Sequence, residues 1–253
     1  ISFDHGGHLT SYAKDSTGVF TTALSVAGAG VGAGAGAIAI NLGAWNDMQG
    51  YDPSNGANPN LSSPDTQMTA VGSRSNASGF LTQALVDVTS LTGAGSVSVR
   101  ALASSTYVAA LVVVAGAGIG AGAGGMTLNV LDAQVEAALD ARGAVTAGRT
   151  VIDATNSTVM SATMVAGSGA GAGAGAGSLA MNVANIASTA RLSGTKDVIL
   201  TLGDVDVSST SAAVVAATAL AISGAGAGAG VGSVAVNAVI NPTEANILLA
   251  GSS

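Results

Sequence analysis

The sequence contains no cysteine, which excludes disulfide bonds and thiolate metal sites. Charged residues make up 8% of the chain and aromatic residues 3%, whereas an average globular protein is about 25% charged. So few aromatic side chains exclude a core built on Phe, Tyr and Trp. The 7 basic and 14 acidic residues give a formal net charge of −7. Because this charge repels phosphate backbones and no basic stripe is present, we expect no nucleic-acid binding.

The residue combinations that enzymes require are also missing. The two histidines, His5 and His8, lie together near position 1, so a Ser-His-Asp triad has no base elsewhere in the chain. The Gly-x-Gly runs alternate without the Lys or acidic ligand that a nucleotide loop needs. The tract from Asp4 to His8 holds metal-ligand types, but no third strong ligand follows, and a flexible polar terminus is the simpler interpretation. We therefore expect no enzyme, no cofactor and no metal site.

What the chain has in excess is glycine, 37 residues in 253, arranged in an internal repeat. Four windows share the pattern Gly, small, aliphatic, Ala or Thr, aliphatic, Asn, and each follows a run of alternating glycine. Their asparagines stand at positions 41, 129, 182 and 237, so the last two intervals agree to within two positions and the first is much longer. A unit of about 53 residues leaves an excess of about 35 in the first copy, which we place in the polar segment 43–79. The windows are Gly36–Asn41, Gly124–Asn129, Gly177–Asn182 and Gly232–Asn237.

We expect one repeat domain over residues 1–253, with copies at 19–106 (including the insertion 43–79), 107–156, 157–210 and 211–253. Alternating stretches after each asparagine indicate about three extended segments per unit. In the third copy the leading valine, Val165, lies two positions further from Asn182 than Val114 lies from Asn129 in the second copy. This difference indicates a two-residue insertion in the third copy.

The uncharged runs are long enough for membrane helices, but their periodicity favours strands. In the first copy Phe20, Leu24, Val26 and the glycines occupy even positions, and alanines occupy odd ones. Strict alternation is the signature of a strand, because successive side chains point to opposite faces. A two-residue insertion preserves both faces of a strand, whereas it rotates a helix by about 200°. We therefore expect strands and no membrane span.

Glycine destabilises strands, so its repeated use needs a physical reason. The reason we expect is close packing, in which the glycine face lets another backbone approach. Valine at Gly120 or Gly171 is then expected to collapse the fold. The representative close-packed positions are Gly32, Gly120, Gly171 and Gly228.

These motifs resemble the repeats of very large bacterial surface proteins. The matching segments are Gly232–Asn237, Asn241–Ile247 and Asp204–Ser208, and the resemblance covers most of the chain outside 1–18 and 43–79. Similar repeats occur in filamentous-haemagglutinin-like adhesins, autotransporter passengers and leukotoxin-type exoproteins. The resemblance implies an all-β, parallel β-helix-like solenoid, export to the cell surface, and a role in adhesion or surface architecture. It implies no catalytic residues.

The four repeated asparagines lie on the small-residue face where each glycine strand ends. Stacked in register they form an amide ladder, while the alternative is four separate turns that each cap one strand. Either role is structural. These residues are Asn41, Asn129, Asn182 and Asn237.

Two other segments leave alternatives open. Asp132, Glu136 and Asp140 recur every four residues, which is typical of a short helix, but alignment with residues 188–194 favours a strand and turn. In the insertion, Trp45 and Tyr51 are the candidate contact residues, because insertions often form the binding surface of repeat proteins. The insertion also suits a passive loop or a cover for a sheet edge.

Two functions follow from these patterns: a structural subunit of an extracellular fibre, or an adhesin that binds a glycan or host protein through the insertion. For the fibre, the alternating start with Ile1 and Phe3 predicts a strand that completes the last repeat of another copy in a head-to-tail homopolymer. The alternative is that the chain is a segment of a longer polypeptide.

Overall fold

The computed structural model describes residues 8–43, 66–75, 80–88, 91–195 and 200–249, and these contain strands and no helix. The expectation of an all-β protein with long parallel strands is confirmed. The strands are β1 (His8–Ala29), β2 (Gly32–Gly43), β3 (Thr66–Ser75), β4 (Phe80–Val88), β5 (Leu91–Ala117), β6 (Gly120–Ala141), β7 (Val145–Ala170), β8 (Gly173–Gly194), β9 (Leu200–Ala225), β10 (Gly228–Ile240) and β11 (Thr243–Leu249).

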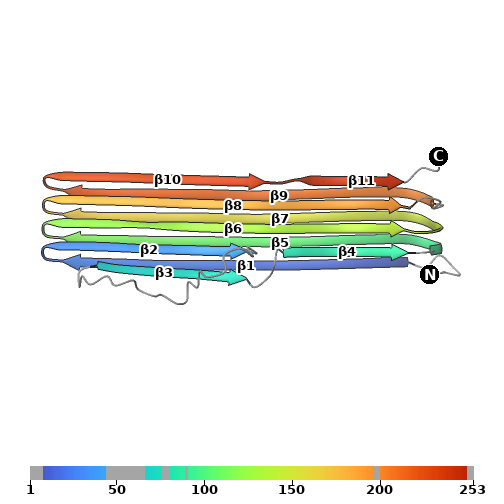
Figure 1. Ribbon diagram of the computed structural model, residues 1–253, viewed down its shortest axis with the longest axis horizontal. Helices are drawn as coiled ribbons and strands as arrows, with labels where there is room; N and C mark the ends of the chain where they lie inside the picture. Colours follow the sequence, from blue (N-terminus) through green and yellow to red (C-terminus); the bar gives the residue numbers. More distant parts are fainter. Residues whose placement is uncertain (1–7, 44–65, 76–79, 89–90, 196–199, 250–253) are drawn as a thin grey trace.

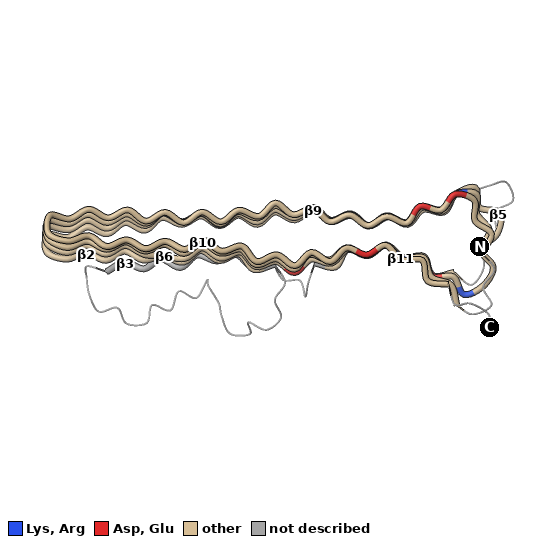
Figure 2. The backbone as a smooth tube through the Cα atoms, turned by 90° about the horizontal axis from the view of Figure 1, so that it is seen from above, with Lys and Arg blue, Asp and Glu red and all other residues tan. Residues whose placement is uncertain are grey.

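The strands form two parallel sheets that face each other as two layers (Figures 1 and 2). We call the sheet in the order β1-β5-β7-β9 sheet 1, and the sheet containing β10, β8, β6, β2 and β3 sheet 2. Within sheet 2, β4 continues β2 along β6, and β11 continues β10 along β8. Each strand of sheet 1 is thus followed by a strand of sheet 2, and we call such a pair a rung. A rung contains two long strands, so the expectation of three extended segments is wrong.

The register is constant along each pair of neighbouring strands, apart from a bulge at the start of β5. Partners between β5 and β7 differ by 53 positions from Ser96 onwards, as do those between β6 and β8. Val112 pairs with Val165 and Asn129 with Asn182, so the valine precedes the asparagine by the same interval in both copies. The expected insertion in the third copy is therefore wrong. The partners between β7 and β9 differ by 55, which places two extra residues in the connection between Gly194 and Leu200.

The excess of the first unit lies at one point of sheet 2. Gly43 pairs with Leu131 and Phe80 pairs with Ala133, so one residue of β6 corresponds to the whole of 44–79. From this segment β3 returns and pairs with β2 from Gly34 to Gly43, which covers that part of its edge. The expected copy boundaries after residues 106, 156 and 210 fall inside β5, β7 and β9.

The alanine face, and not the glycine face, lies between the sheets. Ala27, Ala37 and Ala39 are buried, while Phe20 and Leu24 on the alternate face are 66% and 65% exposed. Methyl groups let two sheets approach closely, and the glycines point away from that contact. The close packing expected at Gly32, Gly120 and Gly228 is therefore not found within one chain. A Cβ at Gly32 or Gly120 meets one backbone oxygen at 3.9 Å, an ordinary contact, and at Gly228 it meets nothing within 4 Å.

The side chains between the sheets change in size along the strands. Next to the short turns at 30–31, 118–119, 171–172 and 226–227 the core is mostly alanine. In the middle it contains Tyr107, Met160 and Ile186. Towards the other end it contains larger aliphatic residues such as Val97, Leu139 and Ile152.

Glycine is required where the chain bends. At the turns, a Cβ at Gly118, Gly171 or Gly226 would overlap the carbonyl oxygen of the preceding turn, at Gly30, Gly118 and Gly171 respectively. The expectation for Gly171 thus agrees with the geometry, although the close neighbour is a turn and not a second sheet. At the other end, Gly93 has a φ of 73° at a bulge in β5, a conformation that favours glycine.

Candidate functional site: the asparagine column and the outer faces

The repeated asparagines form one column through all four rungs, and it is buried at the first three. The Nδ2 of Asn41 donates to Oδ1 of Asn129 at 2.8 Å, and Asn129 donates to Asn182 at 2.8 Å. Asn182 in turn donates to Asn237 at 2.9 Å. Side chains of 0% exposure at the first three positions show that the column lies in the interior. The structure therefore has the ladder arrangement, and not four separate capped turns.

Each amide of the column also binds the opposite sheet. Asn41 donates to the carbonyl of Val108 at 2.8 Å, Asn129 to that of Ser161 at 2.8 Å, and Asn182 to that of Ala216 at 2.7 Å. Both amide hydrogens of these three residues are used, one along the stack and one across it. Thr21 donates to Oδ1 of Asn41 at the first rung. Burying an amide without partners is unfavourable, so the column specifies both the register and the pairing of the two sheets.

The column is incomplete at the fourth rung. Asn237 accepts from Asn182, but its own amide contacts the carbonyl of Val215 at 3.5 Å, the limit of a hydrogen bond. Among the described strands, β9, β10 and β11 each pair along one edge only. The other edge presents backbone donors and acceptors suited to a further strand.

The outward face of sheet 2 is divided into two bands. Nearest the turns are three columns of glycine, which we call the glycine band, and next to them are three columns of larger side chains, which we call the aliphatic band. Twelve glycines at outward strand positions destabilise the sheet by about 0.5–1 kcal/mol each relative to alanine. The glycine columns are Gly32, Gly120, Gly173 and Gly228; Gly34, Gly122, Gly175 and Gly230; and Gly36, Gly124, Gly177 and Gly232. The aliphatic columns are Ile38, Met126, Leu179 and Val234; Ile40, Leu128, Met181 and Val236; and Leu42, Val130, Val183 and Ala238.

A shallow groove of about 490 Å³ lies at the end of the aliphatic band. Its wall includes Leu128, Val130, Met181 and Val183, together with Ile240 of β10. At its far end Asn185 donates to Asp132 at 3.1 Å. The groove thus marks the point where the uncharged surface ends and the polar surface begins.

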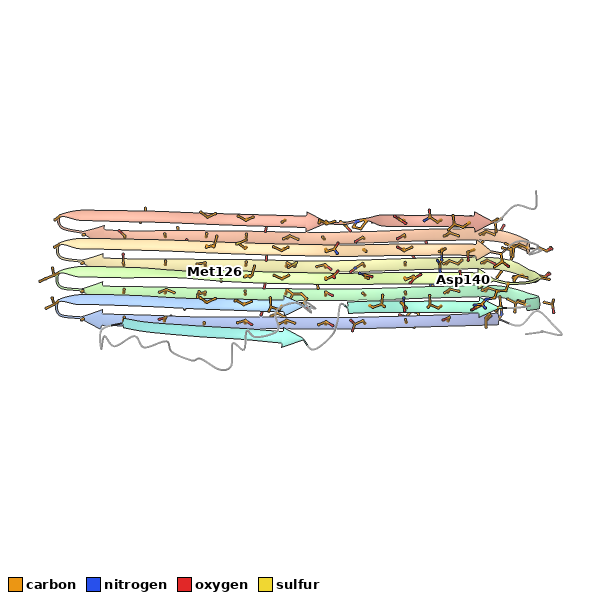
Figure 3. All side chains as sticks on the ribbon, viewed as in Figure 1. Met126 and Asp140 are labelled. Carbon is orange, nitrogen blue, oxygen red and sulfur yellow. The ribbon has the colours of Figure 1, made fainter. Side chains whose placement is uncertain are left out.

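Charged side chains gather at the end of the molecule away from the turns (Figure 2). Figure 3 shows the contrast: Met126 lies in the half near the turns, and Asp140 lies near the opposite end of the same strand. Arg191 bridges Asp140 at 3.1 Å and Glu136 at 3.6 Å, and Arg142 pairs with Asp87. Residues 132–141 belong to β6, so the helix alternative for this segment is wrong.

The described residues contain no group of three His, Asp or Glu side chains placed to hold a metal ion. Among these same residues, no helix is long and apolar enough to cross a membrane. Ile1, Phe3, Trp45 and Tyr51 lie outside the described residues. The turn glycines Gly118 and Gly226 were not singled out from the sequence. Each lies one repeat away from Gly171, so the repeat spacing could have identified them.

No family model, curated protein or solved structure matches the chain.

Proposed function

We propose that this chain is part of an extracellular β-solenoid, a structural protein that forms or decorates a bacterial surface fibre. The observation that carries the proposal is the in-register stack of rungs with a continuous asparagine column. Each rung packs only against the rungs beside it, which is the defining physics of a repeat protein. The two-residue change in the last period is absorbed at a connection, so rungs of the same kind can be added without altering the sheets.

Growth by addition of rungs is supported by the uncovered edge of β9, β10 and β11. A strand added along this edge gains a full set of backbone hydrogen bonds, and its asparagine can accept from Asn237. The additional rung can belong to the same polypeptide or to another copy, which gives a head-to-tail homopolymer. The sequence resemblance to large surface exoproteins supports export and a location on the cell surface.

The growing edge can be tested with lysine on one strand of sheet 1. Ala219 in β9 points between the sheets, whereas its neighbour Leu220 points outwards and is 47% exposed. We expect Ala219→Lys to stop fibre growth, because a further rung would bury the charge. Leu220→Lys is the matched control and leaves its charge in water. Fibres are detected by electron microscopy and by an X-ray fibre-diffraction reflection at about 4.8 Å, the spacing between neighbouring strands. Fibres of equal length from both variants would contradict growth along this edge.

The alternative function is an adhesin whose insertion binds a glycan or a host protein. The observation in its favour is that the entire excess of the first unit emerges between Gly43 and Phe80, at one point of sheet 2. Deleting residues 47–78 removes β3 and uncovers the edge of β2, but it leaves a short bridge where β6 has one residue, so we expect the rungs to fold. Loss of binding to a glycan array or to host matrix protein, while circular dichroism still shows a folded β protein, supports the adhesin. An unfolded deletion variant would show that the segment is part of the core.

A further inference from the structure

The glycine band is not explained by the described chain. A Cβ at Gly122, Gly230 or Gly232 meets no atom within 4 Å, and at Gly175 it meets one backbone oxygen at 3.9 Å. Alanine would fit at these positions and would favour the strand. Glycine at every rung of three adjacent columns therefore indicates that something outside the described chain approaches this face closely.

We propose that the outer face of sheet 2 binds the same face of a second copy of this chain, related by a two-fold axis. The axis runs in the direction in which the rungs stack, between the column of Gly124 and the column of Met126. The glycine band of each copy then lies against the aliphatic band of the other. Gly122, for example, lies opposite the column of Leu128. The two bands have the same number of columns, so a single contact satisfies both copies, as an isologous interface requires.

The size of the face suits a stable dimer. Six columns of side chains along the strands and four strands across give about 40 Å by 19 Å, or roughly 760 Å² per copy, from which the corner at Leu42 is subtracted because this residue is only 6% exposed. Stable protein interfaces bury about 800 Å² per partner. The overlap ends before Asp132, so the charged end of each copy remains in water.

The groove gives an independent reason for this arrangement. In the two-fold arrangement the turn of one copy lies over the end of the partner's aliphatic band, where the groove of about 490 Å³ is found. The groove is lined by the second to fourth rungs, and the turns of these rungs carry Ile119, Ala172 and Ala227, of which Ile119 is 56% exposed. These side chains are apolar, as is most of the groove. A lipid surface is a poorer occupant, because the unpaired edges of β9 and β10 cannot be satisfied in hydrocarbon.

The contact differs from growth by rungs, since it joins faces and leaves the strand edges free. The experiment therefore uses the Ala219→Lys background, in which growth along the edge is blocked. Sedimentation velocity is expected to show a dimer. Adding Gly122→Val and Gly175→Val, which fill the two central positions of one column of the glycine band, is expected to raise the dimer dissociation constant about tenfold or more. Circular dichroism checks that this variant is folded.

The matched control places the same two changes on the outer face of sheet 1. Gly116 and Gly169 form one column there; a Cβ meets nothing within 4 Å at Gly116 and one backbone oxygen at 4.0 Å at Gly169. We expect Gly116→Val with Gly169→Val to leave the dimer intact. Monomers in the background protein, or equal weakening by both pairs, overturn the proposal.

A cross-link gives a second readout that does not depend on filling the band. Because the chain has no cysteine, Met126→Cys introduces a single thiol beside the proposed axis. A short bismaleimide is expected to join two such copies, and Val112→Cys on the outer face of sheet 1 is the control. Equal cross-linking of both variants overturns the proposal. So does a monomer that binds phosphatidylcholine vesicles, because the face is then a lipid surface.

Discussion

The half of each rung near the turns and the half away from them use the same strands and the same register, but they are stabilised differently. Near the turns the sheets are separated by alanine side chains and the outer surface is uncharged. Away from the turns the core is built on valine, leucine and isoleucine, and ion pairs lie outside. A buried alanine removes little apolar surface from water, so the near half depends on close packing and on the asparagine column. The far half depends on the amount of apolar surface that is buried.

The largest effect is expected from truncation in the far half. Ile152 is fully buried in the aliphatic cluster, and Ile152→Ala is expected to lower the free energy of unfolding by about 3–4 kcal/mol. The matched change in the near half, Ala166→Gly, removes a fully buried methyl group and is expected to lower it by only about 1 kcal/mol. Urea denaturation measures both. Equal losses would show that the two halves are packed alike.

In the near half, we expect a larger side chain between the sheets to be more destabilising than the loss of a methyl group there. Ala180 has 0% exposure between the sheets, and Ala180→Leu is expected to lower the free energy of unfolding by about 2–3 kcal/mol, because the sheets must move apart. The control Ala187→Leu lies on the outward face of the same strand and is expected to be nearly neutral. If Ala180→Leu is also neutral in thermal unfolding, the alanine contact is not close-packed.

The asparagine column lies at the border of the two halves and gives an intermediate effect. Asn182→Ala removes the amide bonds to Asn237 and to the carbonyl of Ala216, and leaves the amide of Asn129 without its acceptor along the stack. We expect a loss of about 2 kcal/mol. Asn237→Ala is the control, since it removes an exposed residue at the open edge of β10, and its effect is expected to be below about 1 kcal/mol. Equal effects in denaturant titrations would show that the column does not act as a buried network.

The strands, the period and the position of the insertion could be predicted from the sequence, because alternation and spacing survive in such simple repeats. The inward face could not be chosen by hydrophobicity, since one alternate set is alanine and the other is glycine with larger aliphatics. The asparagines indicated the inward face better. Asn41 lies on the same face as the alanines, and a repeated amide can be buried there because stacking supplies its hydrogen bonds. The three consecutive valines at 112–114 allowed an alignment of Val165 that was shifted by two residues. The groove and the two bands of the outer face could not be predicted, because each is formed by side chains from several neighbouring rungs.

The smallest effect is expected from the ion pairs outside the far half. The side chains of Arg191 and Asp140 are 35% and 36% exposed, so solvent weakens their attraction. Arg191→Met is expected to lower the free energy of unfolding by less than about 1 kcal/mol, and the difference should diminish in high salt. A loss that persists unchanged in roughly 1 M sodium chloride would mean that the pair is screened less than its exposure implies.

The central claim is that neighbouring rungs are stacked in parallel with partners that differ by 53 positions, and disulfide mapping tests it most directly. Gln134 in β6 pairs with Ala187 in β8, both on the outward face, whereas Asn185 is displaced from Gln134 by two residues along the strand. Neighbouring parallel strands lie about 4.8 Å apart, within the range of a disulfide. The variant with Gln134→Cys and Ala187→Cys should therefore oxidise within one chain to a single bond. The variant with Gln134→Cys and Asn185→Cys should not. Equal intramolecular yields from the two variants, or bonds only between chains, would contradict the stacked register.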